Sequence, residues 1–216
     1  TVILAIRAAE ELAKEGISAR VIDMHTIKPL DEELEREAFG FPLILKSGGC
    51  SMRQTLLAGL PAYSVTLSDG QIDTLCRFGE ALIEKNAVMN LTAITEPADV
   101  ARLHLLDCAY LLTAAEFRGQ AVVDVGTGAG FPGMPMAILE PTARLTLLDS
   151  LGKRIDFLQE TAEALKLENV SCIHARAEEF AADHRERYDY AVSRAVAALP
   201  VLSELALPLV KPGGAF

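Results

Sequence analysis

An aspartate and three glycines at alternate positions stand out in the segment "VVDVGTGAGFPGMPMAILE", residues 122–140. Asp124 lies in an apolar run typical of a β-strand, and Gly126, Gly128 and Gly130 separate this run from one typical of a helix. Glycines let the backbone approach a ligand closely, and N–H groups at a helix N-terminus attract a carboxylate or phosphate. A carboxylate at Asp124 would repel a pyrophosphate but suits an ammonium group and hydroxyls. The pattern therefore predicts a site for S-adenosyl-L-methionine, which carries an ammonium group, hydroxyls and a carboxylate.

Other interpretations of the same glycines remain open. Gly128, Gly130 and Gly133 satisfy the GxGxxG pattern of dinucleotide-binding proteins, and a tight strand-to-helix turn without a ligand would also need glycines. Asp149 ends the next apolar run, where Rossmann-like folds place a carboxylate that holds two ribose hydroxyls. This aspartate is expected in both kinds of nucleoside site. It could also lie beside a helix N-cap at Ser150.

Two further segments carry candidate site residues. Residues 174–180, "HARAEEF", follow the third predicted strand, where S-adenosylmethionine sites commonly contact the adenine, so Ala177 and Glu178 are predicted there. An acidic run of this kind is otherwise solvated surface. Lys153 and Arg154 fall in the first turn of a predicted helix, where a cation is disfavoured by ~0.3–1 kcal/mol. They either contact nucleic-acid phosphates or are solvated beside neighbouring carboxylates.

Strand-like and helix-like runs alternate after Gly119. The predicted strands are 120–125, 144–149, 170–175 and 188–193, and the predicted helices are 133–140, 151–166 and 196–210. Apolar strands separated by helices are typical of βαβ units and a mostly parallel sheet covered on both faces. The sequence therefore predicts an α/β fold for residues 119–216, with a fifth strand only beginning at the last residues, "KPGGAF".

Two helices are predicted ahead of this fold, within residues 52–118. Ser68 and Gln71 have the spacing of a capping box. The first helix has an apolar stripe of Ile72, Leu75, Phe78, Leu82 and Ile83, and the second, beginning near Pro97, one of Val100, Leu103, Leu106 and Tyr110. His104 and Asp107 share a face of the second helix, and we expect a structural pair there rather than a site.

The composition excludes several classes of protein. Half of the 216 residues are apolar, yet no apolar run approaches the ~20 residues that span a bilayer, and no signal-peptide pattern is present. The four cysteines are scattered, which predicts reduced thiols in the cytoplasm and no metal site. A net charge of −10 argues against a globally basic nucleic-acid binder. RNA contact would need a local basic rim, for which the candidates are Lys153, Arg154, Arg176, Arg185, Arg187, Arg194 and Lys211.

Residues 1–51 differ in character from the rest of the chain. The stretch "AAEELAKEGISARVIDMHTIKPLDEE" resembles the C-terminal domain of transketolases, over about one unit of that domain within residues 1–40. It contains no glycine-rich phosphate loop, so the resemblance implies no activity here. Gly48 and Gly49 form a flexible joint, and Met52 could be a natural initiator. We expect residues 1–51 to be a fused or mis-joined segment; the alternative is a genuine N-terminal subdomain.

The segments "KNAVMNLTAIT", "DVGTGAGFPG", "LLDSLGKRIDFL", "HARAEEF" and "AVSRAVAALPVL" occur in one order and spacing. Through them, residues 52–216 resemble the bacterial family of small-subunit ribosomal RNA guanine-N7 methyltransferases, also called glucose-inhibited division protein B. The resemblance implies a class I, Rossmann-like methyltransferase fold with S-adenosyl-L-methionine as methyl donor. The implied acceptor is a guanine of 16S ribosomal RNA in the small ribosomal subunit.

The same motifs assign further residues by resemblance. Gly126 and Phe131 match the cofactor loop of the family, and the segment after the third strand matches its adenine contact. Arg194 of "SRA" matches an arginine at the mouth shared by cofactor and substrate. Lys153 and Arg176 are similar to its basic residues near the RNA.

The chemistry implied by this family needs no general base, because guanine N7 carries a lone pair and no proton. The protein must align N7 with the methyl group, exclude water and stabilise a base that becomes cationic. The segment "AVSRAV" contains neither an Asn-Pro-Pro-aromatic motif for exocyclic amines nor a Pro-Cys nucleophile. We therefore predict a positioning enzyme without a catalytic residue list, in which Arg194 is the candidate for a direct role.

The family's fold continues beyond "KPGGAF" with a further helix and two closing strands. We therefore expect a truncated enzyme, marginally stable and weak or inactive, with an internal strand turned into an edge. The expected protein is a monomer that binds neither membrane nor metal. The alternatives are a dinucleotide-dependent oxidoreductase and an RNA-binding fragment that does not consume the methyl donor.

Overall fold

The computed structural model describes residues 51–63 and 65–216. These residues form two compact units, a helical unit over residues 51–116 and an α/β unit over residues 117–216. The structural predictions for residues 1–51 lie outside the described residues except at Ser51, and they stay predictions. Ser51 is the N-cap of the first described helix, where its side chain and Gln54 form a capping box.

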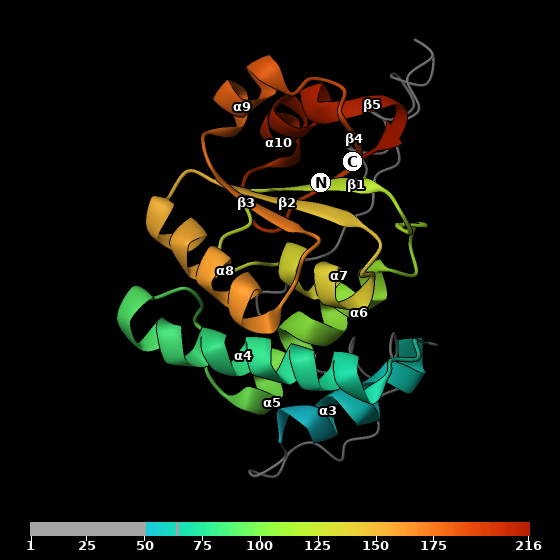
Figure 1. Ribbon diagram of the computed structural model, residues 1–216, viewed down its shortest axis with the longest axis vertical. Helices are drawn as coiled ribbons and strands as arrows, with labels where there is room; N and C mark the ends of the chain where they lie inside the picture. Colours follow the sequence, from blue (N-terminus) through green and yellow to red (C-terminus); the bar gives the residue numbers. More distant parts are fainter. Residues whose placement is uncertain (1–50, 64) are drawn as a thin grey trace. The chain divides into compact units, whose positions relative to one another are not determined.

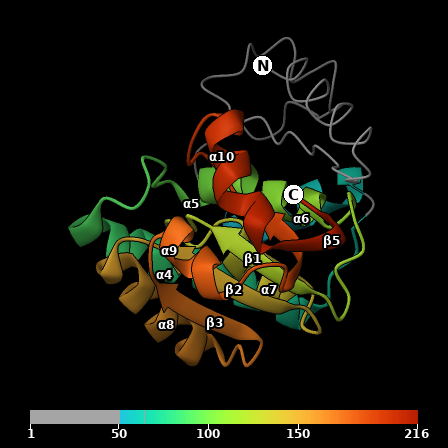
Figure 2. The ribbon, with the colours of Figure 1, turned by 90° about the horizontal axis from the view of Figure 1, so that it is seen from above.

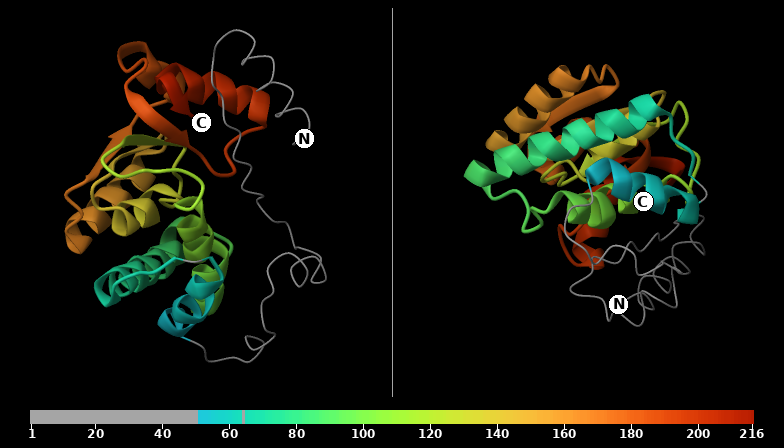
Figure 3. Two further views of the ribbon diagram at one scale, coloured as in Figure 1. Left: turned by 90° about the vertical axis from the view of Figure 1, so that its right-hand side faces the viewer. Right: turned by 90° about the horizontal axis from the view of Figure 1, so that it is seen from below.

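The helical unit begins with α3 (Met52–Gly59), a short 3₁₀ turn η2 (Leu60–Tyr63) and the long helix α4 (Asp69–Met89). α3 packs against α4 (Figure 3). The capping box at Ser68 and Gln71 is confirmed. The predicted stripe of α4 is buried at Ile72, Leu75, Phe78 and Leu82, whereas Ile83 is only partly buried.

The second predicted helix is continuous but contains a π turn. It consists of α5 (Pro97–Val100), the π segment η3 (Ala101–Leu105) and α6 (Leu106–Leu111). The backbone N–H of Leu106 donates to the carbonyl of Ala101, five residues earlier. This extra residue shifts the inward face, so the predicted stripe is wrong at two positions. Leu103 is only partly buried and Tyr110 is exposed, while the residues that are buried are Val100, Ala101, Leu105, Leu106, Cys108, Ala109 and Leu111.

A buried amide holds the chain that links these two helices. The side chain of Asn86 donates to the carbonyl of Thr92 (2.9 Å) and accepts from its N–H (2.8 Å). The hydroxyl of Thr92 also contacts Nε2 of His104 (3.2 Å) and accepts from the N–H of Ile94 (3.1 Å). His104 therefore has a structural contact with Thr92, within the linker that Asn86 holds.

The α/β unit contains a parallel five-stranded sheet in the order β3-β2-β1-β4-β5. The strands are β1 (Ala121–Val125), β2 (Arg144–Asp149), β3 (Val170–His174), β4 (Tyr188–Val192) and β5 (Val210–Ala215). The first four confirm the predicted strands. The prediction that a fifth strand only begins at the end of the chain is wrong, because β5 forms and pairs with β4 from Val210 to Ala215.

Helices cover both faces of this sheet, as predicted. Figures 1 and 2 show α7 (Gly133–Leu139) and α8 (Gly152–Leu165) on one face, and α9 (Ala177–Asp183) and α10 (Leu199–Ala206) on the other. The core beneath α9 and α10 consists of Val123, Val125, Leu148, Phe180, Ala181, Tyr188, Ala191, Ala206, Leu209 and Val210. Burial of these apolar side chains supplies the main stabilisation of the fold.

The last predicted helix is shorter than expected. It was predicted over 196–210, but α10 begins with Pro200 in its first turn and ends at Ala206, followed by a 3₁₀ turn η4 (Leu207–Leu209). Pro200 is favourable at a helix start, whereas Pro208 has no N–H with which to continue an α-helix. The sheet, with all its carboxyl ends at one edge, places the loops after β1, β2, β3 and β4 together.

Candidate functional site

The glycine loop after β1 is closed onto the end of β2. The N–H groups of Gly126 and Thr127 both donate to the carbonyl of Leu148, at 2.8 and 3.0 Å. Gly126 and Gly128 have φ of +70° and +60°, a region that residues with a Cβ rarely adopt. The loop then continues through Phe131 directly into α7. The predicted glycines therefore form one compact turn at the carboxyl edge of the sheet.

Asp124 is fully buried beneath this loop. Its Oδ2 accepts hydrogen bonds from the Thr127 hydroxyl (2.7 Å) and from the Gly133 N–H (2.9 Å), which tie the loop to the start of α7. Its Oδ1 is buried and has no hydrogen-bond partner among the described residues. Burial raises the pKa of Asp124 from 3.8 to about 6, although the two hydrogen bonds and the charge of Arg194 act in the opposite direction. At neutral pH, one oxygen of the carboxylate therefore lacks a hydrogen-bond donor among the described residues.

Gly133 is required for packing. A Cβ at Gly133 would overlap Leu147 Cδ2 on β2 and come within 2.8 Å of Asp124 Oδ2. The last glycine of the GxGxxG pattern therefore allows α7 to lie close to the sheet. This role needs no dinucleotide.

Asp149 lies at the end of β2 and contacts the glycine loop. Its side chain is 5 % exposed, and Oδ2 accepts from the Gly128 N–H (2.9 Å) while Oδ1 accepts from the Leu151 N–H (2.9 Å). Arg154 Nη1 lies 3.4 Å from Oδ2. The interpretation of Ser150 as the N-cap is wrong: Leu151 is the N-cap of α8 and makes no side-chain cap. The structure thus brings Asp149, Gly128 and Arg154 together at one point.

The loop after β4 contacts the same region at three places. Ser193 Oγ donates to the Val125 carbonyl (2.7 Å), and the Arg194 guanidinium lies 4.5 Å from the centre of the Phe131 ring. Between these contacts and α10, Ala195 has a φ of +57°. Val196 lies over Gly126, so that a Cβ there would be 2.5 Å from Val196 Cγ2. The structure therefore brings together Arg194 and Phe131, two residues that the family resemblance assigns to the cofactor site.

The segment after β3 lies next to Asp149 through strand pairing. His174 is paired with Asp149, and the N–H of Ala175 donates to the carbonyl of Asp149 (3.2 Å). α9 then begins at Ala177. Glu178 is exposed and accepts from Arg176 Nε (2.7 Å). Its own N–H and the Arg176 guanidinium hold the pKa of the Glu178 carboxyl below its usual range.

The candidates for a basic rim lie at opposite ends of the strands. Lys153, Arg154, Arg176 and Arg194 follow the carboxyl ends of strands, near the glycine loop. Arg185, Arg187 and Lys211 lie at the amino ends of β4 and β5, where Lys211 Nζ donates to Asp189 Oδ1 (2.6 Å). A single rim that includes the last three residues is therefore wrong, because the length of the parallel strands separates the two groups.

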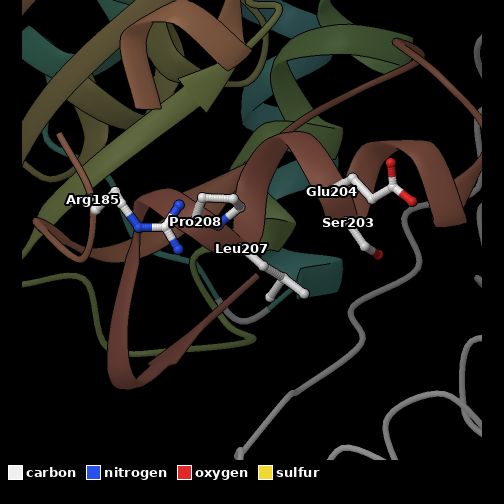
Figure 4. Close-up of a pocket in the computed structure, with 5 residues that line it drawn as sticks. All are labelled: Arg185, Ser203, Glu204, Leu207 and Pro208. Carbon is white, nitrogen blue, oxygen red and sulfur yellow. The ribbon is translucent and has the colours of Figure 1, made fainter. Parts of the chain in front are cut away.

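A shallow hollow lies away from the glycine loop. It is lined by Arg185 and by residues of α10 and η4, namely Ser203, Glu204, Leu207 and Pro208 (Figure 4). Arg185 was a candidate for the basic rim, whereas none of the predicted cofactor-binding residues lines the hollow. Among the described residues, no three His, Cys, Asp or Glu side chains form a group that could hold a metal ion. No helix in the described part of the chain is long and apolar enough to cross a bilayer.

Comparison with known proteins identifies the family. Residues 71–216 match the family rRNA small subunit methyltransferase G, and residues 1–40 match the C-terminal domain of transketolase. A ribosomal RNA small subunit methyltransferase G from Acetivibrio thermocellus is 46 % identical over 167 residues, 76 % of this chain and 69 % of that protein. The protein of the same name from Alkaliphilus metalliredigens is 48 % identical over 167 residues, 76 % of this chain and 70 % of that protein.

A solved structure with a similar chain is the O-methyltransferase from Bacillus cereus in complex with SAH. It is 22 % identical, with a TM-score of 0.48, and covers 62 % of each chain. The family match includes the whole described α/β unit with its glycine loop, Asp149 and the segments after β3 and β4. With nearly half of the aligned residues identical to named relatives, both resemblances seen in the sequence are confirmed, and this chain belongs to the rRNA small subunit methyltransferase G family.

Proposed function

We propose that this chain transfers a methyl group from S-adenosyl-L-methionine to N7 of a guanine in small-subunit ribosomal RNA. Membership of the rRNA small subunit methyltransferase G family supports the reaction class and the RNA substrate. The position of the modified atom follows from the family resemblance of the motifs at 124–133 and 191–202. Such a substrate implies action in the cytoplasm, and we expect the protein to act as a monomer.

One observation carries the choice of donor. Asp124 Oδ1 is a buried carboxylate oxygen without a hydrogen-bond partner among the described residues, directly below the glycine loop. A buried acceptor without a partner costs about 1–3 kcal/mol, so a ligand that donates a hydrogen bond there is favoured. The ammonium group of S-adenosylmethionine is such a donor, whereas a pyrophosphate has no proton to donate and would be repelled. The residues present therefore fit this cofactor, and the dinucleotide alternative is not favoured.

The remaining contacts of the donor are proposed from the same geometry. Asp149, already oriented by Gly128 and Leu151, would accept the ribose hydroxyls. Ala177 begins α9 three residues after His174, which pairs with Asp149, and its small side chain would leave room for the adenine, with Glu178 at the adenine edge. Gly126 and Gly130 complete the loop beneath the methionine end of the donor.

For methyl transfer to N7, the protein must position the guanine and stabilise the positive charge that the base acquires. S-adenosylmethionine supplies an electrophilic methyl group when bound. The Arg194 guanidinium lies over the Phe131 ring at the edge of the site and would donate to O6 of the guanine, which leaves the N7 lone pair free to attack the methyl group. Because N7 loses no proton, none of these residues has to act as a base.

Lys153 and Arg176 are the proposed phosphate contacts. Both are exposed and lie at the carboxyl edge of the sheet, on a chain whose net charge is −10. A local pair of cations is therefore needed to hold an RNA backbone against general repulsion. Arg176 would exchange its exposed Glu178 partner for a phosphate at little cost, since exposed ion pairs contribute ~0–1 kcal/mol.

Donor binding tests the proposal first. Calorimetric titration of the purified chain with S-adenosylhomocysteine should give saturable binding, and titration with NADH should give none. Asp124→Asn should weaken S-adenosylhomocysteine binding at least tenfold, because the ammonium loses its charged partner. Asp156→Asn, which removes an exposed carboxylate of α8, is the matched control and should bind like the wild type.

Methyl transfer is tested on the substrate itself. Small ribosomal subunits that lack the modification should acquire one N7-methylguanine from labelled S-adenosylmethionine. Binding of NADH alone, or donor binding that Asp124→Asn leaves unchanged, would contradict the proposed donor site. Donor binding together with a methyl group at an atom other than guanine N7 would contradict the proposed acceptor.

A further inference from the structure

Arg154 makes a long contact with an otherwise well-held carboxylate. Asp149 accepts two backbone hydrogen bonds at 2.9 Å, one at each oxygen, while Arg154 Nη1 stands at 3.4 Å from Oδ2. A carboxylate offers about four acceptor positions, so Arg154 occupies one of the two that remain for other donors. The Arg154 contact is the weakest of the three, because hydrogen bonds lose strength beyond about 3.2 Å.

The place of Arg154 in α8 also makes this contact easy to exchange. Arg154 lies in the first turn of the helix, where exposed N–H groups disfavour a cation, and no acidic residue of that turn compensates for it. Its side chain is 36 % exposed. An arginine in this position is therefore held mainly by Asp149, and solvent already reaches it.

We propose that Arg154 couples binding of the methyl donor to binding of RNA. This inference rests on the proposed function, in which ribose hydroxyls of the donor reach Asp149. Asp149 has one open acceptor position, so two ribose hydroxyls need both that position and the one at Oδ2 that Arg154 Nη1 occupies. The second hydroxyl would therefore replace Arg154 Nη1. The released guanidinium, at the carboxyl edge of the sheet, then contacts an RNA phosphate, for which its planar pair of donors is suited.

This exchange predicts cooperative binding. If the donor frees Arg154 for the RNA, the donor raises the affinity for RNA, and RNA raises the affinity for the donor by the same factor. Asp149 is buried, but the contact is long and solvent reaches Arg154, so we expect the exchange to change affinity by no more than about fivefold. Lys153 has the same charge and lies in the same turn, but it makes no contact with Asp149 in the described part of the chain.

The first measurement uses the donor product alone. S-adenosylhomocysteine is titrated into the full chain, into Arg154→Gln and into Lys153→Gln. Arg154→Gln should bind two- to fivefold more tightly than the wild type, because a competitor at Asp149 is removed, and Lys153→Gln should bind as the wild type does. Weaker binding by Arg154→Gln would overturn the inference, since Arg154 would then support the donor site rather than compete for it.

The second measurement adds the RNA. Affinity for unmodified 16S ribosomal RNA is measured with and without saturating S-adenosylhomocysteine. The wild type and Lys153→Gln should both bind RNA two- to fivefold more tightly with it, although Lys153→Gln is weaker throughout. The RNA affinity of Arg154→Gln should not change with S-adenosylhomocysteine. Arg154→Lys keeps the charge and should recover part of the increase.

The outcomes separate this inference from the proposed function. A wild-type chain that fails to bind S-adenosylhomocysteine would contradict the proposed function itself. The coupling alone would be overturned if the wild type binds both ligands and S-adenosylhomocysteine raises the RNA affinity of Arg154→Gln as much as that of the wild type. Circular dichroism shows whether each variant is folded. If Arg154→Gln is unfolded, the test is whether S-adenosylhomocysteine still raises the RNA affinity of Arg154→Lys.

Discussion

Replacing Asp124 by asparagine should stabilise the fold at neutral pH while it weakens donor binding. The carboxyl is fully buried, and burial raises its pKa from 3.8 to about 6. Because the folded pKa lies above the unfolded one, the neutral carboxyl is favoured by folding. Its contribution to stability is fully present below pH 3.8 and is lost as pH rises through about 6.

The size of this effect follows from the pKa difference. At 1.36 kcal/mol per pKa unit, a rise from 3.8 to about 6 makes the ionised carboxyl cost about 3 kcal/mol of folding free energy above pH 7. The asparagine side chain of Asp124→Asn would carry no charge, and its carbonyl oxygen could still accept from Thr127 and Gly133. Its amide N–H₂ would be a buried donor in place of the unpartnered Oδ1, which reduces the expected gain to about 1–2 kcal/mol at pH 7.5.

Urea denaturation followed by circular dichroism between pH 4 and pH 7.5 measures this difference. Asp124→Asn should be more stable than the wild type at pH 7.5, and the advantage should vanish near pH 4. Donor affinity of the wild type should fall as pH drops below about 6, because the neutral carboxyl cannot pair with an ammonium. A variant that is less stable than the wild type at pH 7.5, with an unchanged pH dependence, would refute the reasoning.

Three further substitutions test the described packing by their free energies of unfolding. Gly133→Ala should destabilise the chain by about 1–3 kcal/mol, because its Cβ overlaps Leu147; an unchanged urea midpoint would contradict that packing. Ala195→Gly should stabilise it by about 0.5–1 kcal/mol, since glycine adopts a φ of +57° without strain; a loss of stability would show that the side chain matters more than the backbone. Asn86→Ala should cost about 2 kcal/mol, because the N–H and carbonyl of Thr92 lose their partners, and hydrogen exchange at Thr92 should accelerate.

The sequence was sufficient to predict the sheet and the position of the glycine loop. Apolar strands and intervening helices have strong periodicity, and the pattern from Asp124 to Gly130 marks a strand-to-helix turn by local chemistry alone. The extent of α10 and the existence of β5 were harder to predict. "KPGGAF" carries two glycines and a proline and forms a strand only because β4 offers it an open edge.

The contacts within the site could not be predicted from spacing. Nothing in the sequence indicates that one oxygen of Asp124 would be used by Thr127 and Gly133 while the other has no described partner. Contacts between segments far apart in the chain, such as Ser193 with Val125, are equally absent from local patterns. The one available signal was electrostatic: a cation in the first turn of α8 needs a partner, and Asp149 is that partner for Arg154.

The π segment Ala101–Leu105 has a consequence for how the length of this chain can vary. In this turn the N–H of Leu106 reaches back five residues instead of four, so the turn holds one residue more than an α-helix requires. Loss of one residue here would let the turn relax to α geometry with Val100 and Leu106 still facing inward. Loss of one residue from the middle of α4 would instead rotate everything after it by about 100° and expose its buried stripe. Within the helices of this unit, the π segment is therefore a position at which a one-residue deletion is better tolerated than in the middle of α4.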